Sequence, residues 1–258
     1  MLKTNRRFGI EFEFLMPQPE LSKIARRIIG QIYGAGYCVS KDEKYSTLKE
    51  LNKWHIKREN DEVGEINTPI SKLKDLSRIA RVISILAKKK VPVGDGCGLH
   101  VHIEVKDVDK YNLVGFWLQC EKCILECFPS ERRKSISVEK LIKDKSDCKK
   151  YIAEILEHNV NTASHGDIIS LHDYDDRHTV EFRIAEGTTD SIFVTNWIRF
   201  LLYWIEYTKN LHPATVPCHK CNSLKIDDLL SLLSVDDETN DFMLWRHKKY
   251  CKLPYWVK

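Results

Sequence analysis

Three short stretches of this 258-residue chain carry pairs of ionisable side chains spaced two residues apart. In the first, residues 8–14 (FGIEFEF), polar and apolar residues alternate. Successive side chains of a strand point to opposite faces, so Glu11 and Glu13 would share one face and the apolar residues the other. Two carboxylates this close repel unless a cation lies between them or one keeps its proton. Alone, the stretch fits an amphipathic strand with an acidic, solvated face better than a site for a divalent ion.

The same design recurs twice and reverses that preference. Residues 97–103 (CGLHVHI) would place His100 and His102 on one strand face, and residues 179–184 (TVEFRI) would do the same for Glu181 and Arg183. Solvated strand faces more often carry Lys, Thr or Ser at such positions. Carboxylate oxygens and an imidazole suit Mg²⁺ or Mn²⁺, and a neighbouring arginine suits a phosphate oxygen. The three stretches together predict a site for a metal-bound phosphate.

A fourth carboxylate, Glu65, lies in the sequence GEIN at residues 64–67. Several carboxylates around more than one divalent ion imply a polyanionic ligand, so we expect a nucleoside triphosphate. The chain has no Gly-x-x-x-x-Gly-Lys-Ser/Thr loop, which excludes a P-loop. Metal ions and side chains would bind the phosphates instead of a glycine-rich loop.

Hydrophobic periodicity predicts the elements that would position these side chains. The order of elements indicates an α+β domain with a mostly antiparallel sheet and helices packed on one face. We expect residues 1–210 to form the catalytic domain and residues 211–258 a helical and aromatic extension packed on it. Helices are expected near 20–33, 71–90 (capped by Ser71), 108–128, 137–158, 191–210 and 224–234, and strands at 8–14, 53–68 (a hairpin), 99–105, 168–172 and 179–185.

Composition fits a globular protein, with 43% hydrophobic and 30% charged residues and a mild net charge of +4. No apolar run reaches the roughly 20 residues of a membrane helix, and the N-terminal residues lack the apolar segment of a secretory signal. Nine irregularly spaced cysteines then favour reduced thiols in the cytoplasm. Cys120, Cys123 and Cys127 are expected to be core thiols, and Cys218-x-x-Cys221 is only half of a zinc site.

Four blocks of the chain resemble, in order, the signatures of the amidoligases: residues 8–13, 64–69, 97–102 and 179–183. That family belongs to the superfamily of glutamine synthetase and glutamate–cysteine ligase, which join carboxylates to amines. The resemblance implies a glutamine synthetase-like catalytic domain. In it, a curved, mostly antiparallel sheet binds ATP and two or three Mg²⁺ ions, Mn²⁺ being an alternative, on its concave face, and helices pack on its convex face.

The resemblance also implies roles for individual residues. Arg183 would stabilise the transferring phosphoryl group, and Glu59 stands where the family usually has Asp. One of Arg132 and Arg133 matches a functional arginine of the family, and His102 would either contact nucleotide or substrate or be structural. His100 would contact both metal and phosphates. The implied metal ligands are Glu11, Glu13, Glu65, His100 and Glu181.

The chain departs from the family pattern at three places. Ser170 replaces a common Asn, His178 replaces a common Gly, and Asn60-Asp61 replaces a usual Gly-Ser. These departures bear on substrate contacts more than on metal binding.

The implied reaction is ATP-dependent ligation. ATP phosphorylates a carboxylate, and an amine then displaces phosphate to form an amide or isopeptide bond. The substrates would be small molecules or peptides; protein side chains and modified nucleotides also fit the family, and nucleic acid is not indicated. Two alternatives stay open: a metal-dependent phosphotransferase or phosphohydrolase with the same ligands, and a catalytically degenerate nucleotide-binding or protein-binding module. The sequence identifies neither the substrates, nor the general base, nor the oligomeric state.

Overall fold

The computed structural model describes residues 2–15, 38–40, 54–58, 63–94, 96–130, 132, 168–211 and 224–251. The chain divides into two compact units. Unit 1 contains Met1–Thr4, Ile103–Ile184 and Asn196–Lys258, and unit 2 contains Asn5–His102 and Ala185–Thr195. The helices expected near 20–33 and 137–158 lie outside the described residues.

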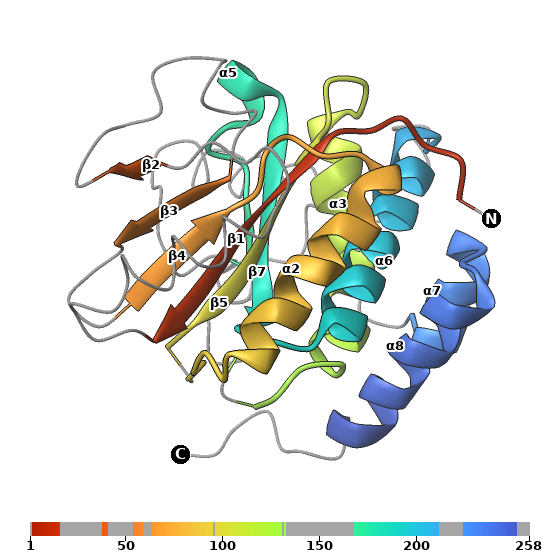
Figure 1. The fold of residues 1–258 in the computed structure, drawn as a ribbon. Coiled ribbons are helices and arrows are strands. Elements are labelled where there is room, and N and C mark those ends of the chain that lie inside the picture. The colour runs from red at the N-terminus through yellow and green to blue at the C-terminus, as the bar shows by residue number, and fades with distance from the viewer. Residues whose placement is uncertain are drawn as a thin grey trace. The chain divides into compact units, whose positions relative to one another are not determined.

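Within the described residues, seven strands form a sheet in the order β2-β3-β4-β1-β5-β7-β6. Figure 1 labels all of these strands except β6. The pairs β1–β4, β3–β4 and β6–β7 are antiparallel, whereas β2 pairs with β3 in parallel. The predicted α+β class with a mostly antiparallel sheet is therefore confirmed. The strands are β1 (Phe8–Leu15), β2 (Cys38–Ser40), β3 (His55–Arg58), β4 (Val63–Asn67), β5 (Gly98–Glu104), β6 (Ile169–Ser170) and β7 (Thr179–Glu186).

Strand β1 shows the predicted alternation. Its even-numbered side chains from Phe8 to Phe14 are buried, and its odd-numbered ones, Glu11 and Glu13 among them, are half-buried. The apolar set anchors the strand, because fully burying one large apolar side chain contributes about 1.5–3 kcal/mol. The acidic pair is thereby held on the opposite face. The expected hairpin is also confirmed, since β3 and β4 pair antiparallel.

Helix α2 (Leu76–Lys88) follows the short 3-10 turn η1 (Leu73–Asp75). It buries an apolar stripe from Leu76 to Leu86, as predicted, but Ser71 does not cap it. Ser71 instead forms a β-bridge with Phe8, in which each residue's N–H donates to the other's carbonyl at 2.8–2.9 Å. The backbone of Ser71 thus extends the sheet, and the helix begins a turn later.

Unit 1 contains an aromatic core. The rings of Phe116, Trp117 and Phe182 pack around Trp204, with centroids 5.3–5.8 Å from that of Trp204. Trp204 comes from α6, whose predicted span is confirmed. The helices are α3 (Lys110–Leu125), α5 (Tyr174–Arg177), α6 (Ser191–Lys209, whose first turn belongs to unit 2), α7 (Ile226–Leu233) and α8 (Asp237–Tyr250).

Two helices of unit 1 differ from expectation. The segment between β6 and β7 contains the single-turn helix α5, and the aromatic tail contains the full helix α8; neither helix was expected. Helix α8 lacks a clear apolar stripe, so periodicity misses it. Asp236 caps it by accepting the backbone N–H of Thr239 at 2.9 Å, and the buried Arg246 donates to the Cys127 carbonyl at 2.8 Å.

Across the described residues, none of the helices combines the length and the apolar character that spanning a membrane requires.

Candidate active site

The acidic face of unit 2 is set by the pairing of β1 with β4. Glu13 lies directly opposite Glu65, and Glu11 directly opposite Asn67. Residues directly opposite in an antiparallel pair point to the same face, with Cβ atoms roughly 4.5–5.5 Å apart. Glu65 is only 2% exposed. A buried carboxylate facing a second carboxylate favours the uptake of a cation, since like charges opposite one another destabilise a sheet.

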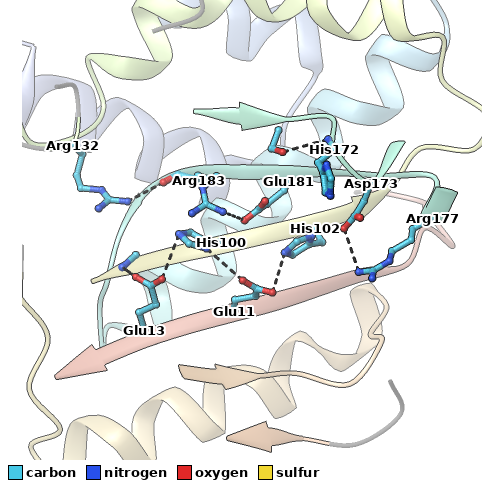
Figure 2. A network of polar contacts seen from close by, with 12 residues as sticks. Glu11, Glu13, His100, His102, Arg132, His172, Asp173, Arg177, Glu181 and Arg183 are labelled. Atoms are coloured by element: carbon cyan, nitrogen blue, oxygen red, sulfur yellow. Dashed lines mark hydrogen bonds and ion pairs between the residues drawn. The ribbon is translucent and has the colours of Figure 1, made fainter. Parts of the chain in front are cut away.

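Two imidazoles of β5 complete this face. In Figure 2, His100 lies between Glu11 and Glu13: its Nδ1 is 3.5 Å from Glu11 Oε2, and its Nε2 is 3.9 Å from Glu13 Oε1. His102 Nε2 lies 3.4 Å from Glu11 Oε1. These separations exceed the usual hydrogen-bond range of roughly 2.7–3.2 Å. They match the spacing of atoms that share an ion at bonds of about 2.1 Å, so Glu11 and His100 could ligate one metal.

Backbone atoms hold Glu13 in place. Its Oε2 accepts the N–H of Gly98 at 2.6 Å. The preceding residue, Cys97, accepts the N–H of Gly187 at 2.8 Å. A Cβ at position 187 would lie 2.6 Å from Cys97 Cβ, far inside contact distance, so the approach requires glycine there. Gly187 therefore fixes the chain that presents the Gly98 N–H to Glu13.

In unit 1, Glu181 and Arg183 lie side by side on β7. Arg183 Nη1 donates to Glu181 Oε1 at 2.5 Å, and both side chains are largely buried. Ser170 of β6 lies directly opposite Glu181. The Glu181 carboxylate therefore has a permanent cation beside it, and the Arg183 guanidinium is oriented by that carboxylate.

Arg132 contacts the main chain of β7. Its Nε donates to the Ile184 carbonyl at 3.2 Å and its Nη2 to the Arg183 carbonyl at 2.9 Å (Figure 2). The planar guanidinium thus spans two successive carbonyls and fixes the strand that carries Arg183. These bonds hold the Arg132 guanidinium against the main chain of β7.

The predicted site residues fall into three groups. Unit 2 brings together Glu11, Glu13, Glu65, His100 and His102 on one strand face, and unit 1 brings together Arg132, Glu181 and Arg183. Their roles in catalysis stay predictions. The candidates Glu59 and Arg133 and the cysteine pair Cys218 and Cys221 lie outside the described residues.

Two polar residues on the same face, His55 and Asn67, were not predicted as site residues from the sequence. His55 lies directly opposite Asn67, which in turn lies opposite Glu11. His55 is 5% exposed and Asn67 8% exposed. The two-residue spacing from Glu65 to Asn67 was a signal for Asn67. No comparable signal existed for His55, because its place depends on the register of β3.

The cysteines of α3 are core thiols, as expected. Cys120 and Cys123 are buried, and burial raises the pKa of Cys123 to about 12 and that of Cys120 well above its usual value. Metal ions bind the thiolate, so thiols that resist deprotonation are poor ligands.

The comparison with protein-family models agrees with the amidoligase resemblance. A search of curated proteins found no match. A solved structure titled "Crystal structure of the complex between Prokaryotic Ubiquitin-like Protein Pup and its Ligase PafA" is 12% identical, with a TM-score of 0.46 over 95% of this chain. This chain spans 64% of the length of that one. The model of the family described as "Putative amidoligase enzyme" matches residues 4–205. Because that match covers most of the sequence, the chain belongs to the amidoligase family.

Proposed function

We propose that this protein is an ATP-dependent ligase that joins a carboxylate to an amine, as an amide or isopeptide bond. Membership of the amidoligase family supports the reaction class. The observation that carries the proposal is the acidic face of unit 2, where Glu13 faces the buried Glu65 and His100 lies between Glu11 and Glu13. Such a concentration of acids has a physical reason if cations and a polyanionic nucleotide bind there.

The residues present fit Mg²⁺, and also Mn²⁺. Carboxylate oxygens are the ligands that both ions take, and an imidazole is acceptable to Mn²⁺. The proposed ligand set is Glu11, Glu13, Glu65, His100 and Glu181; Glu11, His100 and Glu181 each offer one ligand atom of the right kind. A bound divalent ion would neutralise the phosphate charge and favour attack at the γ-phosphorus.

In the proposed reaction, a substrate carboxylate oxygen attacks the γ-phosphorus of ATP, and ADP leaves. The amine nitrogen then attacks the acyl carbon of the acyl phosphate, the bond to the phosphate oxygen breaks, and inorganic phosphate leaves. Arg183 would stabilise charge on the transferring phosphoryl group, with its guanidinium oriented by Glu181. Arg132 would act by holding β7. Positioning and charge neutralisation would supply most of the rate enhancement.

His102 would orient Glu11, which it approaches at 3.4 Å, and would lie next to the nucleotide. Glu59 and Arg133 are kept as further candidates from the family resemblance. Substrates would be small molecules or peptides that carry a carboxylate and an amine.

The test is to incubate the purified protein with ATP, Mg²⁺ and pools of carboxylic acids and amines. Products are identified by mass spectrometry, and ADP and phosphate are measured in parallel. Amide formation coupled to ADP release supports ligation. Phosphate release that does not depend on an amine would show a phosphohydrolase, and phosphoryl transfer to an acceptor without amide would show a phosphotransferase. Nucleotide binding without turnover would show a binding module.

Two variants complete the test. Glu11→Ala and Glu181→Ala should abolish ATP-dependent coupling and retain the fold. Glu238→Ala, which removes an exposed carboxylate that pairs with Arg199, should not affect coupling. Coupling retained in both Glu11→Ala and Glu181→Ala would refute their assignment as ligands.

A further inference from the structure

Helix α2 of unit 2, gold in Figure 1, carries a concentration of positive charge. Residues 72–90, which run from just before η1 to the end of α2, contain seven lysines and arginines and one acid, Asp75. Their net charge of +6 exceeds the +4 of the whole chain. All seven cationic residues are exposed, whereas Asp75 is half-buried and accepts the Lys72 backbone N–H at 2.9 Å. The mild overall charge thus coexists with a strongly basic surface.

Four of these cations share one face of α2. A helix turns by about 100° per residue, so Arg78, Arg81, Lys88 and Lys89 fall within an arc of about 100°. We call these four residues the basic stripe. From Arg78 to Lys88 the stripe is about 15 Å long, because each residue of a helix rises 1.5 Å. The apolar side chains of α2 lie on another face and are buried: Leu76, Ile79, Val82, Ile83 and Leu86.

The electrostatics of the helix itself do not account for the stripe. A helix dipole favours acids in the first turn and cations in the last. Helix α8 follows this rule at both ends, whereas α2 has no acid in its first turn and places Arg78 there. Arg78 and Arg81 are three residues apart, and neighbouring like charges destabilise a helix. The dipole therefore explains the lysines at the end of α2 but not the two arginines.

The residue after the stripe shows the same preference for a cation. Lys90 has φ 53°, in the left-handed region where glycine is the usual residue. The Val91 N–H donates to the Leu86 carbonyl at 3.1 Å, which closes the end of α2 in a motif that commonly has glycine at this position. The backbone alone would thus favour glycine over Lys90. A charged residue kept in an unfavourable conformation agrees with a role for its charge.

An acid also lies beside α2, in the segment that leads into α6. Ser191, at the start of α6, places its Oγ 3.3 Å from Ser84 Oγ of α2. The preceding Asp190 accepts the Ile192 N–H at 2.8 Å and so caps α6. With Asp75 and Asp190 both counted against the seven cations, the surface keeps five excess positive charges. It therefore attracts an anionic partner.

The chemistry of the surface favours a nucleic-acid duplex as that partner. Insertion into a membrane requires a free apolar helix face, and that of α2 is buried. Protein interfaces and single-stranded nucleic acids are bound largely through aromatic side chains, and α2 contains none. Near it, only the aliphatic Ile70 and Ile192 are large exposed apolar residues among those that the structure describes for unit 2. A duplex is bound through its phosphates by lysine and arginine alone.

We propose that unit 2 binds double-stranded DNA through the basic stripe of α2. The major groove of B-DNA is roughly 12 Å wide and admits an α-helix, whereas that of an RNA duplex is narrow and deep. The contacts are to phosphates, so the binding does not depend on base sequence. This DNA-binding activity adds to the proposed ligase function and does not rest on it.

The experiment measures binding of the full-length protein to a fluorescein-labelled DNA duplex by fluorescence anisotropy at several KCl concentrations. An RNA duplex of the same length, vesicles rich in phosphatidylserine, and polyglutamate are the competing probes. Arg78→Gln/Arg81→Gln alters the stripe, and Lys225→Gln/Lys248→Gln, at two exposed lysines of unit 1, is the charge-matched control. Lys90→Gly removes a cation and also relieves the left-handed conformation, so a loss of binding in this variant is not caused by unfolding. Urea unfolding checks the fold of every variant.

We expect saturable DNA binding that weakens steeply as salt rises. The double arginine variant should bind at least about tenfold more weakly and reduce the slope of log affinity against log salt by about 2, since each phosphate contact contributes about 0.9. Lys90→Gly should bind about twofold more weakly with a raised urea midpoint, and the control should bind like the parent. Absence of DNA binding, equal binding by the stripe variant, or equal or tighter binding of the RNA duplex, the vesicles or polyglutamate would overturn the proposal.

Discussion

The carboxylates of the two units differ in how their charge is balanced. In unit 2, Glu13 faces Glu65 across a strand pair, Lys57 stands opposite Glu65 on β3, and His100, whose charge depends on protonation, lies 3.9 Å from Glu13. In unit 1, Glu181 lies 2.5 Å from the guanidinium of Arg183, which is always charged. The first arrangement favours the uptake of a cation. The second is already neutral as a pair and offers its arginine to an anion.

The largest effect should come from removing one acid of the unit 2 pair. Glu65→Gln or Glu13→Gln should lower metal-dependent nucleotide coupling at least about 100-fold, because each removes a proposed ligand. Glu13→Gln should raise the thermal midpoint of the metal-free protein or leave it unchanged, since it relieves the like-charge repulsion with Glu65. ADP release in the coupling assay measures the first effect. Differential scanning fluorimetry with and without Mg²⁺ measures the thermal midpoint.

The matched substitution in unit 1 should behave differently. Glu181→Gln should lower the midpoint of the metal-free protein, because it removes the counter-charge of Arg183. If both substitutions shifted the midpoint in the same direction, the contrast between the two units would be wrong.

A smaller effect is expected at Gly187, which contacts the segment whose backbone N–H donates to Glu13. Gly187→Ala should destabilise the protein by about 1–3 kcal/mol, since its Cβ would overlap Cys97, and should weaken Mg²⁺ uptake by displacing the Gly98 N–H from Glu13. Gly96→Ala is the control, because a Cβ there meets no atom within 4 Å. Urea unfolding and a Mg²⁺ titration of both variants test the claim; equal behaviour of the two would contradict it.

In unit 1, Asp236→Ala should lower the free energy of unfolding by about 1 kcal/mol at neutral pH, because the N-terminal cap of α8 is lost. Burial alone would raise the pKa of Asp236, but hydrogen bonds from Thr239 and Tyr203 and the charge of Arg199 leave it lowered. The stabilisation is therefore present above the unfolded-state value of about 3.9 and is lost as pH falls through the folded-state pKa.

Unfolding of Asp236→Ala and of the parent protein at neutral and acidic pH checks this. The difference in unfolding free energy should shrink in acid, and Mg²⁺ uptake should match that of the parent. A difference that grew in acid would reverse the sign of the argument.

The smallest expected effect is an increase in stability. His178 ends α5 in the left-handed conformation, with φ 53° and ψ 45°, where a side chain is unfavourable. His178→Gly should stabilise unit 1 by about 0.5–1 kcal/mol, offset in part by loss of the contact between His178 Nδ1 and the Tyr174 carbonyl at 3.2 Å. A lower urea midpoint for this variant would mean that the contact outweighs the strain.

The sequence predicted which side chains share a strand face but not which strands meet. The two-residue alternation placed Glu11 with Glu13 and His100 with His102 because that period is a property of a single strand. The pairing of Glu13 with Glu65 depends on the register between two strands, which hydrophobic patterns alone do not specify.

Two further features gave no signal in the sequence. Arg132 was a candidate site residue, but its bonds to main-chain carbonyls leave no trace in the residue types of its partners. Helix α8 is stabilised by its cap and by Arg246 instead of an apolar stripe, so periodicity gave no signal for it.

The central claim is that the acidic face of unit 2 takes up cations together with nucleotide. Isothermal titration of the protein with adenylyl imidodiphosphate, in the presence and absence of Mg²⁺, tests it most directly. We predict saturable binding that requires Mg²⁺ and that is lost in Glu13→Gln and Glu65→Gln while circular dichroism shows the fold retained. Absence of binding, or binding of equal strength in the variants, would contradict the account.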